Sequence, residues 1–147
     1  MYTRRTIFAI IAATMATPVF AGSPPIFANS NDIAINGYDT VAYFTQSEPI
    51  AGLPLLSTEW NGAIWLFATT KTLNMFIDNP EAYAPRFGGY CAYAASKGAI
   101  APTTPEAWTV YEGKLYLNAN LRARDLWRQD IPGNIAKGDA NWPAILD

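Results

Sequence analysis

Alternating apolar and polar residues around a tight turn predict a first hairpin. Residues 56–60 and 63–67 are rich in aromatic and aliphatic side chains, and they flank Asn61-Gly62. An Asn-Gly pair in this setting is the strongest short hairpin signal, because both turn residues must adopt a positive φ. We therefore expect two antiparallel strands joined at this turn.

The same kind of pattern returns later in the chain. Residues 108–111 and 115–117 alternate apolar positions with more polar ones, and Glu112-Gly113 lies between them. Alternation with a period of two is typical of a strand that buries one face. The sequence thus predicts a second hairpin.

Helical spacing of apolar residues predicts short helices between and after the hairpins. In the clearest case, Leu73, Phe76 and Ile77 fall on one face of an amphipathic helix. Pro132-Gly133 is expected to end a later helix. Together these elements make an α+β domain, a small antiparallel sheet built from two hairpins and packed with several short helices. The expected helices cover residues 40–44, 70–78, 90–97 and 120–130, with a last helical turn around Ile135.

The first residues have the layout of an export signal. Arg4 and Arg5 give a positive start, residues 6–19 form an uncharged and mostly apolar run, and small or slim residues precede a cleavage point after Ala21. We expect a secretory signal peptide over residues 1–21, and hence a periplasmic or secreted protein exported by the Sec or the twin-arginine route. The alternative is an uncleaved membrane anchor, although the run is shorter than the ~20 apolar residues that span a bilayer. No membrane contact is expected after cleavage.

The rest of the chain is interpreted as one small domain behind a short leader. Residues 22–31 hold paired prolines and small polar residues, which predict a flexible leader. Residues 32–147 form the domain. The chain carries 10 basic and 12 acidic side chains and has no basic run. Because nucleic-acid binding rests on cationic contacts to phosphate, nucleic acid is not an expected partner.

One cysteine and no histidine narrow the chemistry that the chain can perform. A single thiol cannot close a disulfide within the chain, so the apolar core must hold the fold. The lack of histidine excludes His-based catalytic triads and His-ligated metal sites. Cys91 is therefore the one residue suited to thiol or soft-metal chemistry.

Cys91 follows a Gly-Gly pair and is expected in the first turn of the helix over residues 90–97. Free amides and the helix dipole stabilise a thiolate there, whereas burial in an apolar pocket opposes it. Tyr90 and Tyr93 flank the sulfur and are candidates to shield it or to donate hydrogen bonds to it. A functional sulfur must lie close enough to the surface to meet a partner. The competing interpretation is a small apolar packing residue.

Tyr38 and Asp39 form a second candidate binding cluster. Asp39 also suits the start of the helix over residues 40–44, because its carboxylate can accept from the free amides of a first helical turn. We favour this capping role over a role as acid, base or ligand.

Six stretches support a resemblance to a known family. They are residues 35–44 (INGYDTVAYF), 59–63 (EWNGA), 79–85 (NPEAYAP), 88–93 (GGYCAY), 114–118 (KLYLN) and 139–143 (DANWP). In this order and over nearly all of the expected domain, they resemble the YHS domain group, and in particular the exported YHS domain-containing proteins and selenoproteins.

The resemblance bears on metal binding in two ways. The wider group carries metal-ligating cysteines, and at those positions this chain has Ala42, Ala68 and Thr72. A structural metal site needs several thiolate or imidazole ligands, so the resemblance implies that the wider group's metal site is absent. In the related exported proteins the position of Cys91 is cysteine or selenocysteine, which implies redox or soft-metal chemistry at this residue.

Three functions remain open at this point. In the first, the domain is a binding module in which Cys91 is a ligand for copper or another soft metal ion, with Met75 as a further candidate ligand. In the second, Cys91 is a redox-active cysteine that passes through a sulfenic acid and is restored by an outside thiol partner. In the third, the domain has a structural or interaction role and Cys91 is packed. The sequence favours the first and third, both without catalysis, over the second.

Overall fold

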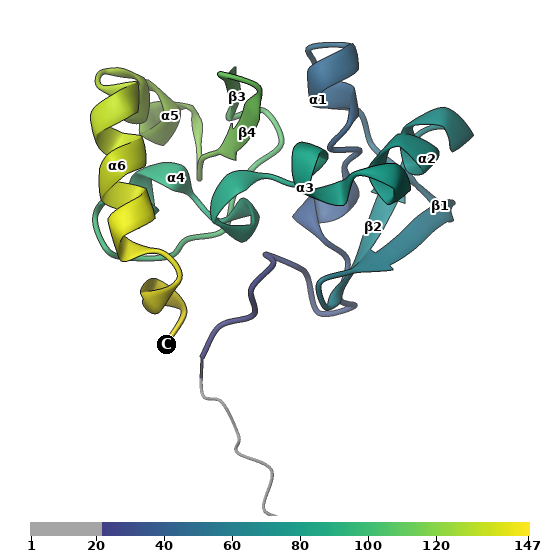
Figure 1. Cartoon of the computed structure of the whole chain (residues 1–147), viewed down its shortest axis with the longest axis horizontal. Helices are drawn as coiled ribbons and strands as arrows, with labels where there is room; N and C mark the ends of the chain where they lie inside the picture. The colour runs from purple at the N-terminus through teal and green to yellow at the C-terminus, as the bar shows by residue number, and fades with distance from the viewer. Residues whose placement is uncertain (1–21) are drawn as a thin grey trace, which may run out of the picture.

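The fold is α+β, as the sequence predicts, and its two hairpins form two separate antiparallel sheets. A computed structural model describes residues 22–147, so the predicted signal peptide over residues 1–21 lies outside the described residues. Figure 1 shows two halves, each built around one hairpin with its own helices. Short 3-10 helices lie at Ile35–Gly37, Arg86–Gly89 and Ala144–Leu146.

The first half contains the longer hairpin, whose turn lies at the predicted Asn61 and Gly62, with φ values of 50° and 81°. Its core is aromatic: the ring centroids of Trp65 and Phe67 lie 4.9 Å and 5.0 Å from that of Phe76. All three side chains are buried. The elements of this half are α1 (Ala42–Thr45), β1 (Leu53–Trp60), β2 (Ala63–Phe67), α2 (Thr70–Asp78) and α3 (Pro80–Tyr83).

The second half contains the shorter hairpin, with its turn at the predicted Glu112 and Gly113. Trp127 is buried at its centre, and its ring centroid lies 4.9 Å from that of Tyr116. The second core cluster also includes Phe87 from the preceding loop. The elements of this half are α4 (Ala92–Ser96), β3 (Trp108–Tyr111), β4 (Lys114–Leu117), α5 (Leu121–Arg128) and α6 (Ile131–Asn141).

The prediction that Pro132-Gly133 ends a helix is wrong, because these residues lie in the first turn of α6. The first amides of a helix have no intrahelical acceptor, so a proline loses nothing at this position. Asp130 caps the new helix, and its Oδ1 accepts from the amide of Gly133 at 3.1 Å. What was expected as one helical turn around Ile135 is therefore an 11-residue helix.

The predicted bounds of α2 are confirmed, and its predicted buried face is only partly correct. Phe76 is fully buried, whereas Ile77 is 52% exposed. The face that turns inward is instead completed by Thr72, one helical turn before Phe76. None of the helices within residues 22–147 combines the length and the apolar character needed to cross a membrane.

Residues 22–31, predicted as a flexible leader, contact both halves (Figure 1, purple). Ile26 is buried in the core of the first half. The amide of Phe27 donates to the carbonyl of Gly88 at 2.8 Å. Tyr90 Oη donates to the carbonyl of Pro24 at 2.9 Å. The segment therefore ties the first half to the loop that leads into α4.

Candidate functional site

The loop before Cys91 has an unusual backbone that sets the direction in which the chain enters α4. Phe87, Gly88 and Gly89 have φ values of 56°, 63° and 84°. The φ of Gly89 disfavours any residue with a Cβ, and an added Cβ would also press on the buried side chain of Ile35. The loop leaves Cys91 immediately before α4, as its N-cap residue.

The sulfur of Cys91 is buried among polar groups. The residue is 2% exposed. Its Sγ accepts hydrogen bonds from the amides of Ala94 at 3.5 Å and Ala119 at 3.3 Å. It also lies 3.4 Å from Oδ1 of Asn118, to which the thiol S–H donates. The neutral thiol thus has both acceptor and donor partners inside the chain.

Asn118 adds a buried carboxamide to the site, beside the thiol that caps α4. It follows β4, is fully buried, and accepts at Oδ1 from the amide of Tyr93 at 2.9 Å. Its backbone amide donates to Ala107 at 2.9 Å. Its Nδ2 has no hydrogen-bond partner among the described residues. Because buried polar groups are nearly always hydrogen-bonded, an orphan donor next to a thiol requires an explanation.

The site differs from its sequence prediction in position. Cys91 lies one residue before α4 instead of within its first turn. Its exposure was left open by the sequence, and at 2% exposed the residue has the burial expected of the packed alternative. Because α4 has only five residues, its dipole is small, and the direct N–H contacts matter more. Sequence reasoning missed Asn118 and Ala119, for which the one local signal is a polar residue directly after an apolar strand.

The side chains of the two tyrosines beside Cys91 bind groups other than the sulfur. Tyr90 is 7% exposed, and its hydroxyl binds the carbonyl of Pro24. Burial raises the pKa of Tyr90, which keeps its hydroxyl a hydrogen-bond donor. The ring of Tyr93 lies under the ammonium of Lys97, at 5.2 Å from Nζ to the centroid. Tyr93 reaches the site through its backbone amide, and within residues 22–147 neither tyrosine hydroxyl makes a hydrogen bond to the sulfur.

Tyr38 and Asp39 lie in the first half and form no joint site with Cys91. The Asp39 carboxylate is fully buried, and its Oδ1 accepts from the amides of Val41 and Ala42 at 3.0 Å and 3.2 Å. Asp39 thus accepts from amides at the start of α1, as predicted, but the helix begins at Ala42 after Val41 as its N-cap residue, and not at Thr40. Tyr38 is half-buried and pairs through its backbone with Ala51.

The three positions that the family resemblance matches to metal-ligating cysteines converge on Asp39. Oδ2 of Asp39 accepts from the amide of Ala68 at 2.9 Å and from the hydroxyl of Thr72 at 2.6 Å. Ala42 contributes its amide to Oδ1. In this chain a hydrogen-bonded carboxylate therefore fills the point where those positions meet.

Met75 is not brought to Cys91. It packs against the core of the first half, whereas Cys91 lies between α4 and the end of β4 in the second half. Within residues 22–147, no group of three or more Cys, Asp or Glu side chains is placed to hold a metal ion. Cys91 thus has no protein co-ligand among the side chains predicted for it.

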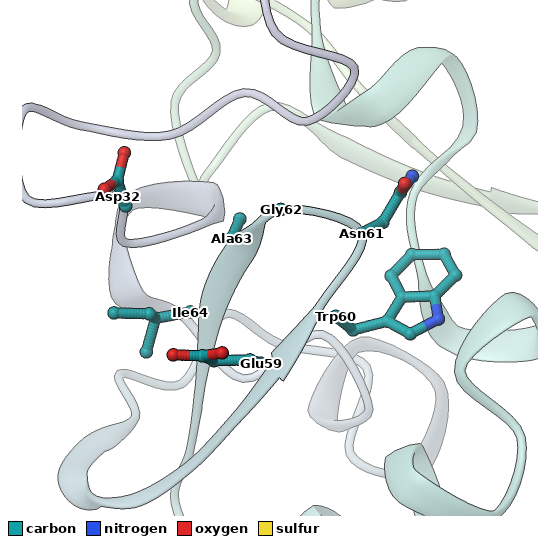
Figure 2. Close-up of a pocket in the computed structure, with 7 residues that line it drawn as sticks. All are labelled: Asp32, Glu59, Trp60, Asn61, Gly62, Ala63 and Ile64. Carbon is teal, nitrogen blue, oxygen red and sulfur yellow. The ribbon is translucent and has the colours of Figure 1, made fainter. Parts of the chain in front are cut away.

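Hollows on the described surface lie away from the thiol. One of about 400 Å³ surrounds the β1–β2 turn and includes Asp32 and Glu59. Figure 2 shows the side chains of Glu59 and Trp60 pointing in opposite directions from β1, so its lining groups do not converge. A second, of about 480 Å³, is lined by Trp60 and Trp142, and a third, of about 360 Å³, lies beside α2. Cys91 lines none of these three hollows.

Comparison with known proteins gives no identification. No protein-family model, curated protein or solved structure matches this chain. The resemblance to the YHS domain group stays a prediction from the sequence motifs.

Proposed function

We propose that this domain is a single-thiol redox protein, in which a small hydroperoxide oxidises Cys91 to a sulfenic acid and a small thiol restores it. The observation that supports the proposal is the set of polar groups around Sγ. The amides of Ala94 and Ala119 donate to the sulfur, whereas Oδ1 of Asn118 accepts from the neutral thiol. N–H donors favour negative charge on the sulfur or on an oxygen bound to it.

The proposed cycle balances atoms and electrons. The Cys91 thiolate attacks one peroxide oxygen, so that an S–O bond forms, the O–O bond breaks, and hydroxide leaves and is protonated to water. The sulfur loses two electrons and the peroxide gains them. A thiol RSH then displaces water from the sulfenic acid to give a mixed disulfide, and a second RSH releases reduced Cys91 and RSSR.

Burial of the sulfur limits the reactants that fit. Because Cys91 is 2% exposed, the surface of another protein does not reach Sγ directly. Hydrogen peroxide, the smallest hydroperoxide, is close to water in size and needs the smallest opening of the site. The chain has no second cysteine, so the sulfenic acid finds no thiol within its own chain with which to form a disulfide. A buried sulfenic acid at this site is therefore long-lived.

The two alternatives account for less of the geometry. A soft metal ion prefers several thiolate or thioether ligands, and Met75 lies in the other half of the domain. A purely packed cysteine accounts for the burial and for the bond from Ala94, because the sulfur then caps α4. It does not account for the second amide, from Ala119, or for the unpaired Nδ2 of Asn118.

Peroxide treatment of the folded protein is expected to add one oxygen atom to Cys91, and dithiothreitol is expected to remove it. Intact-mass spectrometry measures the gain and its reversal, and peptide mapping locates the oxygen. The physical reason is that the donors around Sγ stabilise the charge that develops on the sulfur and its oxygen.

Cys91→Ser is the matched control, because its hydroxyl keeps the capping group of α4 and lacks the sulfur. Met75 can also take up an oxygen, but methionine sulfoxide is restored by dedicated reductases, so reversal by dithiothreitol alone separates the two residues. An unmodified Cys91 under conditions that oxidise Met75 would contradict the proposal.

A further inference from the structure

We infer that Nδ2 of Asn118 binds the oxygen of oxidised Cys91 and so protects the sulfenic acid from further oxidation, an inference that rests on the proposed redox function. Asn118 is 0% exposed, and its Nδ2 has no partner among residues 22–147. A buried donor without an acceptor is unfavourable. An oxygen added to the neighbouring sulfur supplies the missing acceptor.

The hydrogen bonds of the Asn118 carboxamide identify which of its two ends has no partner. Oδ1 accepts from the Tyr93 amide at 2.9 Å and lies 3.4 Å from Sγ, where it accepts from the reduced thiol. Exchanging the oxygen and nitrogen would place Nδ2 against the N–H of Tyr93, with two donors facing each other. The free end is therefore Nδ2, on the same carboxamide that already touches the sulfur.

Oxidation reverses the hydrogen-bonding demand at the sulfur. The reduced thiol donates one hydrogen bond, whereas an ionised sulfenate has no proton to donate, and its oxygen accepts. Donors are then available from the amides of Ala94 and Ala119 and from Nδ2 of Asn118. Hydrogen bonds to an ionised acceptor are stronger than those between neutral groups. Donors that bind the S–O group also draw electron density from the sulfur, which slows its attack on a second peroxide.

The test measures how much of the oxidised Cys91 carries two oxygens instead of one. Asn118→Leu replaces the carboxamide with an apolar side chain of similar size and removes Nδ2. Under a fixed exposure to hydrogen peroxide, we expect the fraction of Cys91 with two oxygens, which dithiothreitol does not reverse, to rise about tenfold over wild type. Peptide mapping after dithiothreitol measures this fraction directly.

Two further variants separate the role of Nδ2 from a general loss of stability. Asn118→Asp keeps an acceptor for the Tyr93 amide and lacks the Nδ2 donor, so it is expected to increase the doubly oxidised fraction too, and it answers the question if the leucine variant fails to fold. Leu73→Ala truncates a half-buried side chain in the other half of the domain. This control is expected to keep the wild-type fraction of doubly oxidised Cys91.

The outcomes distinguish this inference from the proposed function. If both Asn118 variants keep the wild-type fraction, or if Leu73→Ala raises it equally, Nδ2 has no protective role, while reversible oxidation of wild-type Cys91 still stands. If wild-type Cys91 never gains a first oxygen, the proposed function fails and the inference fails with it.

Discussion

Replacing Asp39 with alanine is expected to lower the free energy of unfolding by about 3–5 kcal/mol. The carboxylate is 0% exposed and has no cationic partner within residues 22–147, where hydrogen bonds alone satisfy it. Alanine removes the acceptor and leaves the four donors that bind the carboxylate buried and unpaired, each at a cost of about 1–3 kcal/mol in isolation. The donors are the amides of Val41, Ala42 and Ala68 and the hydroxyl of Thr72.

Urea unfolding followed by tryptophan fluorescence measures the effect, with Asp130→Ala as the matched control. Asp130 is an exposed cap that accepts from the amide of Gly133, so its loss is expected to cost only about 1 kcal/mol. Equal and small losses in the two variants would show that the Asp39 network does not stabilise the first half as described.

Replacing Gly88 with alanine is expected to lower the free energy of unfolding by about 3 kcal/mol. Gly88 has a φ of 63°, which disfavours any residue with a Cβ. An added Cβ would also lie 2.0 Å from the carbonyl oxygen of Pro25, so the leader segment or the loop must move. The loop carries the chain into Cys91, and its displacement also disturbs the hydrogen bond from Phe27 to Gly88.

Gly113→Ala separates the two causes in the same unfolding experiment. Gly113 has a φ of 75°, close to that of Gly88, but nothing lies within 4 Å of an added Cβ. Gly113→Ala is therefore expected to lower the free energy of unfolding only through the unfavourable backbone conformation, by about 1–2 kcal/mol. If the two alanine variants are equally destabilised, the contact between Pro25 and Gly88 contributes nothing.

The elements that could be predicted from sequence are those fixed by residues close together in the chain. The turns at Asn61-Gly62 and Glu112-Gly113 specify both hairpins, and the bounds of α2 follow from its own period and from the Asn-Pro pair after it. Whether the hairpins join one sheet depends on packing between distant segments. The structure keeps them in two sheets, each beside its own core.

The error at Pro132 has a local cause. A Pro-Gly pair is unfavourable inside a helix, yet proline is also favoured in a first helical turn. The deciding residue is Asp130, whose carboxylate accepts from the amide of Gly133 and so favours a helix start. The pattern of apolar residues does not show whether the Asp130 cap or the Pro-Gly pair determines the local structure.

The candidate site was only half predictable. Cys91 is evident as the one thiol, and its place at a helix start follows from the preceding glycines. Its partner Asn118 is 27 residues away and meets it only because α4 packs at the end of β4. Burial of the sulfur also depends on that packing, which is why the sequence left open whether the thiol lies near the surface or is packed inside.

The most direct test of the redox account compares a small and a bulky reagent on Cys91 of the folded protein. The rate of thiol loss is measured with hydrogen peroxide and with an aromatic disulfide, each in native buffer and in urea. The account predicts that hydrogen peroxide consumes the thiol of the folded protein faster than global unfolding permits, while the aromatic disulfide reacts only in urea. If both reagents require urea, Cys91 is a packed cap of α4 and the proposed redox function is wrong.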